Sequence, residues 1–181
     1  QGQSDIDLNE VGREQARSMA LAIAALNPGA VVASDLSRAA ETAELVAAGL
    51  GLEVQLDSRL RERNFGQWEG LTGADIEVGW AAEYATWRSG QYPEGIGAET
   101  RGVVGERFAR GVEDAAAELS SSETLLVVAH GACIAAGITT LLGLDADSWV
   151  GIRGIGNCHW SVLGSSDREP RWRLEGHNVS A

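Results

Sequence analysis

The chain of 181 residues carries a formal net charge of −12 at pH 7, and its composition, 44% hydrophobic and 22% charged, is ordinary for one globular domain. The negative field repels nucleic acid and anionic membranes, so we expect neither as a partner. All 14 basic residues are arginine, which excludes a Schiff-base lysine or a P-loop lysine and leaves Arg, His and backbone amides to form any anion site.

The first part of the chain predicts alternating helices and strands. Apolar residues at helical spacing follow Asn9, a plausible N-cap, and Ser34 or Asp35 can cap the second helix. The predicted elements are a helix over 8–29, a strand over 30–34, a helix over 36–51 and a strand over 52–57.

Residues 59–97 follow no regular period and contain three of the six tryptophans. Part of this segment is helical, because Thr72 with Asp75 resembles a capping box. We interpret the segment as a lid-like insertion over one end of a sheet.

The rest of the chain returns to alternation. It predicts a helix over 98–120, a buried strand from Thr124 that ends at His130, a helix over 133–143, and neighbouring strands over 156–164 and 171–177. Strands that alternate with helices indicate an α/β fold, a three-layer sandwich with a largely parallel central sheet flanked by helices. We expect residues 1–181 to form a single domain.

Two cysteines, Cys133 and Cys158, are too few for a disulfide framework and indicate a reducing compartment. The longest apolar runs fall short of the roughly 18–20 residues that cross a membrane, and no secretory signal is visible. We therefore expect a cytoplasmic protein.

Three side chains are expected to converge where the parallel strands end, which is where such sheets bind ligands. His130 ends its strand, and Arg38 lies one helical turn beyond another strand, so its guanidinium can fold back to hold a phosphate or carboxylate. Glu62 is a carboxylic acid that could protonate a leaving oxygen.

Each of these residues also has a simpler interpretation. A histidine at a strand end is often a satisfied core residue, Arg38 alone could be a solvated helix residue, and Glu62 could belong to a surface ion-pair cluster. The three arginines around Glu62 are Arg59, Arg61 and Arg63. On residue chemistry alone, the sequence predicts no more than an anion site.

A zinc site is a second alternative. His130, Cys133, Cys158 and His159 offer a soft set of nitrogen and sulfur ligands. Against it, Cys158 and His159 are neighbours on a predicted strand and would point to opposite faces.

Three motifs occur in order along the chain: "SDLSRAAETA" over 34–43, "RLRERNFGQWEGLT" over 59–72 and "VVAHGACIAA" over 127–136. Together they resemble the downstream signatures of the histidine phosphatase superfamily, which includes the cofactor-dependent phosphoglycerate mutases. The chain is most similar to an actinobacterial branch that acts on sugar phosphoglycerates. The resemblance implies a phosphoglycerate mutase-like fold and a phosphatase for a small anionic phosphate monoester, with no cofactor or metal and with a homodimer as a plausible assembly.

The same resemblance implies a role for each site residue. Arg38 would clamp the phosphate, Glu62 would act first as general acid and then as base, and His130 would donate to the phosphoryl oxygens. Gln1 would match a glutamine that reaches the substrate.

The nucleophile of this family is a histidine in an R-H-G motif that ends the first strand, and the sequence has no such motif. His159 and His177 stand in other contexts. We therefore expect the first strand and the nucleophile upstream of Gln1, within roughly 20 residues, since a strand needs about 5–6 and a loop the rest. Mutase-type phosphoryl transfer, or a catalytically silent homologue that binds a phosphorylated ligand, are the alternatives.

Overall fold

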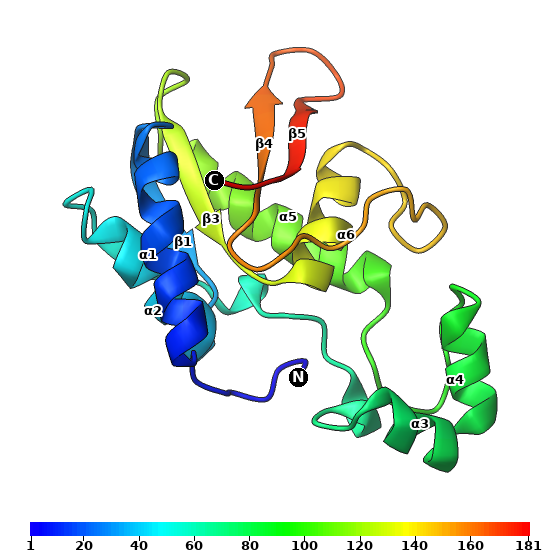
Figure 1. The fold of residues 1–181 in the computed structure, drawn as a ribbon. Coiled ribbons are helices and arrows are strands. Elements are labelled where there is room, and N and C mark those ends of the chain that lie inside the picture. Colours follow the sequence, from blue (N-terminus) through cyan, green and yellow to red (C-terminus); the bar gives the residue numbers. More distant parts are fainter.

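The computed structural model describes residues 1–181 and has three layers (Figure 1). In the central layer β1 lies between β2 and β3, and all three strands are parallel. Helices α1 and α2 cover one face of this sheet, and α5 and α6 cover the other (Figure 1). The bounds are α1 Glu10–Ala24, β1 Pro28–Ala33, α2 Ser37–Ala47, β2 Val54–Leu56, α5 Arg101–Ala117, β3 Thr124–Val128 and α6 Gly131–Leu141. The predicted α/β sandwich is confirmed.

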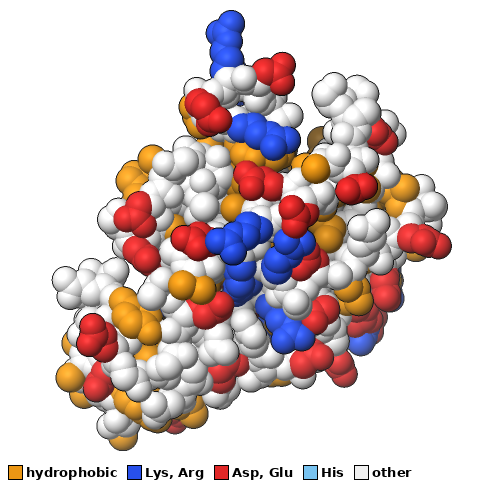
Figure 2. Space-filling view, turned by 180° about the vertical axis from the view of Figure 1, so that it is seen from behind, with side chains coloured by type: hydrophobic (Ala, Val, Ile, Leu, Met, Phe, Trp, Pro, Cys, Tyr) orange, Lys and Arg blue, Asp and Glu red, His pale blue; other side chains and the backbone are white.

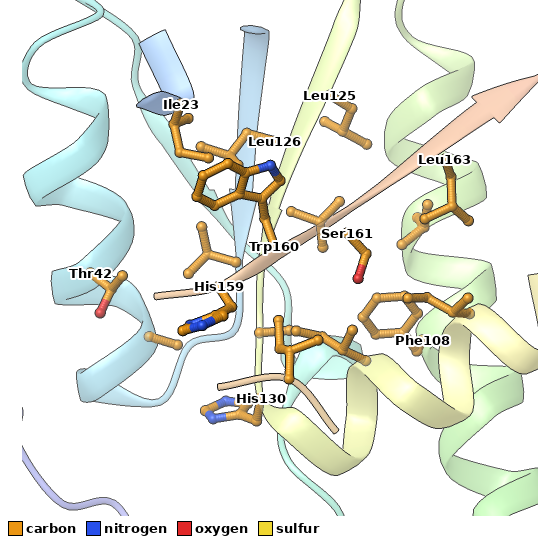
Figure 3. A pocket seen from close by; sticks show the side chains of 18 of the residues that line it. Ile23, Thr42, Phe108, Leu125, Leu126, His130, His159, Trp160, Ser161 and Leu163 are labelled. Carbon is orange, nitrogen blue, oxygen red and sulfur yellow. The ribbon is translucent and has the colours of Figure 1, made fainter. Parts of the chain in front are cut away.

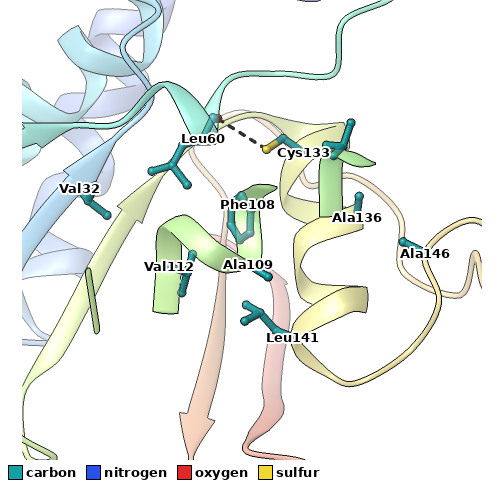
Figure 4. Packing of buried hydrophobic residues seen from close by; sticks show 10 residues of the cluster. Val32, Leu60, Phe108, Ala109, Val112, Cys133, Ala136, Leu141 and Ala146 are labelled. Carbon is teal, nitrogen blue, oxygen red and sulfur yellow. Dashed lines mark hydrogen bonds between the residues drawn. The ribbon is translucent and has the colours of Figure 1, made fainter. Parts of the chain in front are cut away.

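Strand β1 joins the two outer layers because its side chains alternate between them, as the pleat requires. Val31 and Ala33 pack against α2, whereas Val32 packs with Phe108 of α5 on the other face. Figure 4 shows this second cluster, in which Leu60 lies above the helices and the Cys133 thiol donates to the Leu60 carbonyl. The segment after β2 is thereby tied to α6.

The two late strands are neighbours, as expected, but they form a sheet of their own. β4 (Trp160–Ser165) and β5 (Trp172–Val179) are antiparallel and pair with neither β1 nor β3. β4 runs opposite to β3 (Figures 1 and 4). The strand predicted to be buried is therefore only half-buried in β3, because one of its edges has no partner strand.

The N-caps of the helices show which helix starts can be predicted from local sequence patterns and which cannot. The Asn9 side chain caps α1 by accepting from the Gly12 amide, and the capping box of Thr72 and Asp75 is present. The predicted cap of α2 is wrong, because Leu36 is the N-cap and has no side-chain bond. Ser34 and Asp35 are both engaged elsewhere, and the carboxylate that accepts from the Ser37 amide and hydroxyl belongs to Asp5.

The segment predicted as a lid contains α3 (Gly73–Gly79) and α4 (Ala81–Arg88), which extend away from the sheet (Figure 1). Trp68 is buried in an aromatic cluster at its centre, edge-on to both Tyr84 and Trp87. Its closure over the site stays a prediction. Within the whole chain, none of the helices has the length and apolarity to cross a membrane.

Candidate active site

A cavity of about 1550 Å³ lies between β3 and β4, and the four predicted site residues, Gln1, Arg38, Glu62 and His130, all line it. Figure 3 shows its interior, with His130 at one end. That end is where the parallel strands β1 and β3 finish, as expected for an α/β sheet. The structure therefore places the predicted residues on the lining of one cavity.

His130 is held at the end of β3 by a buried hydroxyl. Its Nε2 lies 2.9 Å from the Ser34 Oγ, which also accepts from the Leu36 amide, so the hydroxyl hydrogen is free to point at the imidazole. Burial, followed by the positive charges of Arg38 and Arg107, lowers the pKa of His130 to about 3. The imidazole is therefore neutral at physiological pH.

This neutral histidine predicts a pH dependence of folding. The pKa of His130 falls from 6.5 to about 3 on folding, so stability that is complete above pH 6.5 is lost as the pH falls towards 3. One proton contributes about 1.4 kcal/mol per pH unit. Between pH 6.5 and 5 we expect the wild type to lose about 2 kcal/mol more unfolding free energy than His130→Gln, measured by urea denaturation. Parallel pH profiles for the two proteins would contradict this.

Arg38 folds back from the first turn of α2, as the sequence predicts. Its Nη1 donates to the Ser4 carbonyl at 2.9 Å and its Nη2 to the Gly2 carbonyl at 2.8 Å. No carboxylate forms an ion pair with it. A half-buried guanidinium without a counter-ion is suited to bind an anion.

The loop that carries Gln1 is held by a residue that sequence analysis missed. The Glu69 carboxylate accepts from the amides of Gln3, Ser4 and Phe65 and from the Ser4 hydroxyl. Burial raises the pKa of Glu69, but these donors outweigh it and leave the pKa below its usual value. Its partners are up to 66 residues distant in sequence, so no local signal could indicate the contact.

Glu62 does not take part in the ion-pair cluster that its neighbours suggested. Arg59 pairs with Asp57 and Asp114, and Arg61 pairs with Asp35. Arginine and carboxylate side chains also lie among one another on the back face of the molecule (Figure 2).

The Glu62 carboxylate lies instead at the N-terminus of α6, one turn from His130. It accepts from the amides of Ala132 at 3.1 Å and Cys133 at 2.8 Å, and from its neighbour Arg63 at 2.8 Å. Helix N-termini favour negative charge, so α6 fixes this carboxylate beside His130.

The zinc alternative finds no support in the geometry. No group of three or more His, Cys, Asp or Glu side chains is placed to hold a metal ion. Burial raises the pKa of the Cys133 thiol, which donates to the Leu60 carbonyl.

The cavity lies between two unpaired strand edges and is partly lined by apolar side chains. Leu126 and Trp160 face it with Ile23 of α1 on one side, and Phe108 and Leu163 face it on the other (Figure 3). The edges of β3 and β4 along it have no partner strand. Pockets for small molecules are usually about 300–1,000 Å³, and edges left open in an apolar interior are unfavourable.

Residues 1–179 match the family model of the histidine phosphatase superfamily (branch 1). The chain belongs to this family. The prediction of a histidine phosphatase, made from the three motifs, is confirmed.

Several relatives are similar over the whole chain. The glucosyl-3-phosphoglycerate phosphatases of Mycobacterium tuberculosis and Mycolicibacterium vanbaalenii are 37% and 35% identical over 196 residues, which span 100% of this chain and 87% of each relative. The structure of a mycobacterial glucosyl-3-phosphoglycerate phosphatase superimposes with a TM-score of 0.88 at 34% identity, over 100% of this chain and 92% of that one. A complex of that enzyme with VO3 superimposes with a TM-score of 0.89 at 36% identity, over 99% and 90% of the two chains.

Proposed function

We propose that the protein hydrolyses a small anionic phosphate monoester of the phosphoglycerate or sugar-phosphoglycerate type through a phosphohistidine intermediate. One observation carries the proposal: Arg38, Glu62 and His130 all line one cavity beside the carboxyl ends of β1 and β3. The nucleophilic histidine would end a strand that precedes Gln1 and occupies this cavity. A strand parallel to β3 there would finish beside His130 and pair with both open edges.

Arg38 supplies positive charge for the phosphoryl group, and His130 donates an N–H to an equatorial oxygen. The nucleophilic imidazole nitrogen forms a bond to phosphorus as the ester P–O bond breaks, and the leaving alkoxide takes a proton from Glu62. Water then attacks phosphorus, the P–N bond breaks, and the Glu62 carboxylate accepts the proton of the water.

The relatives support the phosphatase reaction and the substrate class. The similar actinobacterial proteins are named glucosyl-3-phosphoglycerate phosphatases, and one is described in complexes with inorganic phosphate and with VO3. A probable phosphoglycerate mutase, GpmB of Cronobacter sakazakii, is 37% identical over 81% of this chain and 68% of its own. If the protein converts a phosphate ester to inorganic phosphate, it is a phosphatase; if it forms an isomeric ester, it is a mutase. Homodimer formation and cytoplasmic location stay predictions.

The acid role of Glu62 predicts selective loss in Glu62→Gln. Turnover of 3-phosphoglycerate, whose alkoxide needs a proton to leave, is expected to fall about 10²–10⁴-fold. p-Nitrophenyl phosphate has a good leaving group, and its turnover should fall less than about tenfold. Both rates are measured as phosphate release, with Glu113→Gln on the exposed face of α5 as the matched control. Equal losses on the two substrates would overturn the acid role.

A further inference from the structure

The guanidinium of Arg107, on α5, hydrogen-bonds to the backbone that precedes Glu62 and at Glu62 itself. Its Nη1 donates to the carbonyls of Arg59 at 2.7 Å and Arg61 at 2.6 Å, and its Nη2 donates to the Glu62 carbonyl at 2.9 Å. The remaining Nη2 and Nε hydrogens go to the Glu99 carboxylate, each at 2.9 Å. All five N–H donors of this guanidinium therefore have an acceptor.

The segment held in this way has no strand partner to fix it. The carbonyl between those bound by Arg107, that of Leu60, accepts from the Cys133 thiol (Figure 4), so four successive carbonyls are satisfied by α5 and α6 side chains. Glu99 adds a second attachment, because its carboxylate also accepts from the Asn64 amide at 2.8 Å. Both sides of Glu62 are anchored.

Burial separates this pair from the surface arginines. The side chains of Arg107 and Glu99 are only 18% and 21% exposed, whereas Arg110, one turn along the same helix, is 71% exposed and pairs only with Glu106. A half-buried guanidinium costs desolvation energy that a surface ion pair avoids. Lysine could not replace it, because one ammonium cannot reach acceptors spread over the fork of a guanidinium.

We propose that Arg107, together with Glu99, is a positioning residue for the general acid Glu62. This inference rests on the proposed phosphatase function. Arg107 reaches the backbone of the acid and not the substrate, and it sets the distance between the carboxyl and the leaving oxygen. Proton transfer depends steeply on that distance, since a displacement of 1 Å can cost about 10²-fold in rate.

The test measures the turnover of two substrates with different leaving groups by the Arg107→Met and Arg107→Lys variants of the active protein. Arg110→Met is the matched control. Turnover of 3-phosphoglycerate should fall about 10²-fold in Arg107→Met and less in Arg107→Lys, whereas turnover of p-nitrophenyl phosphate should change only a few-fold. KM should stay within about twofold in both variants. Combined with Glu62→Gln, Arg107→Met should add no further loss on 3-phosphoglycerate.

Equal losses on both substrates, or losses that multiply in the double variant, would show that Arg107 only stabilises the fold. If Arg107→Met does not fold, Arg107→Lys and Glu99→Gln decide the same question by the same comparison. The proposed function fails separately, when the wild-type protein with the proposed strand ahead of Gln1 releases no phosphate or its Glu62→Gln variant shows no leaving-group selectivity. When Glu62→Gln is selective and the Arg107 variants are not, only the positioning role is overturned.

Discussion

Arg38→Ala is expected to lower kcat/KM for a phosphate monoester by at least about 10²–10³-fold, the usual cost of removing one donor to a developing anionic charge. Two effects act together. The variant loses a guanidinium that has no counter-ion at the proposed phosphate position. It also loses the hydrogen bonds from Arg38 to the Gly2 and Ser4 carbonyls, which hold the loop of Gln1 in place. Steady-state phosphate release from 3-phosphoglycerate measures the effect.

Two further variants separate these effects from general electrostatics. Arg17→Ala changes the net charge of the protein equally, but Arg17 lies half exposed on α1 among Glu10 and Glu14, so its activity should stay within about twofold of wild type. Arg38→Lys keeps the charge without the fork and should recover only a small part of the rate. If Arg38→Ala retained wild-type kcat/KM, the phosphate clamp would be wrong.

The parts of this molecule that the sequence predicts correctly depend on near neighbours. The caps at Asn9 and Thr72 form between residues three positions apart, so their signal lies within one window of sequence. His130 and Arg38 could be placed because strand ends follow from apolar runs and parallel ends share one edge. The three family motifs indicate roles for these residues that residue chemistry leaves open, and those roles stay predictions.

The parts that the sequence does not predict depend on contacts between distant residues. Asp5 caps α2 from 32 residues away, and Arg107 reaches the Glu62 carbonyl from 45 residues away. The ion-pair interpretation of Glu62 failed for the same reason, since its neighbouring arginines have partners at Asp35 and Asp114. An apolar run likewise indicates burial without showing which strands supply it, and β3 is half-buried because it pairs with β1 along one edge only.

Residues 1–181 alone are expected to release no phosphate, whereas a protein that also carries the proposed strand ahead of Gln1 should be an active phosphatase. The physical reason is that the cavity between β3 and β4 has two open strand edges, and residues 1–181 contain no R-H-G motif to supply the proposed nucleophile. A strand buried on both faces should be almost continuously apolar and should end in the histidine that attacks phosphorus. Phosphate release from 3-phosphoglycerate by the two proteins is the first measurement.

Amide hydrogen exchange tests whether the proposed strand lies in the cavity, independently of whether its histidine is catalytically active. Amides of β3 and β4 that face the cavity should exchange at least about 10²-fold more slowly in the longer protein, because paired amides exchange only through larger openings. Amides of β1 are the internal control, since this strand already lies between two partners in residues 1–181. If the longer protein is active but β3 and β4 exchange unchanged, the nucleophile reaches His130 from outside the cavity. If the amides become protected without activity, the strand is correctly placed and the protein binds phosphate esters without hydrolysing them.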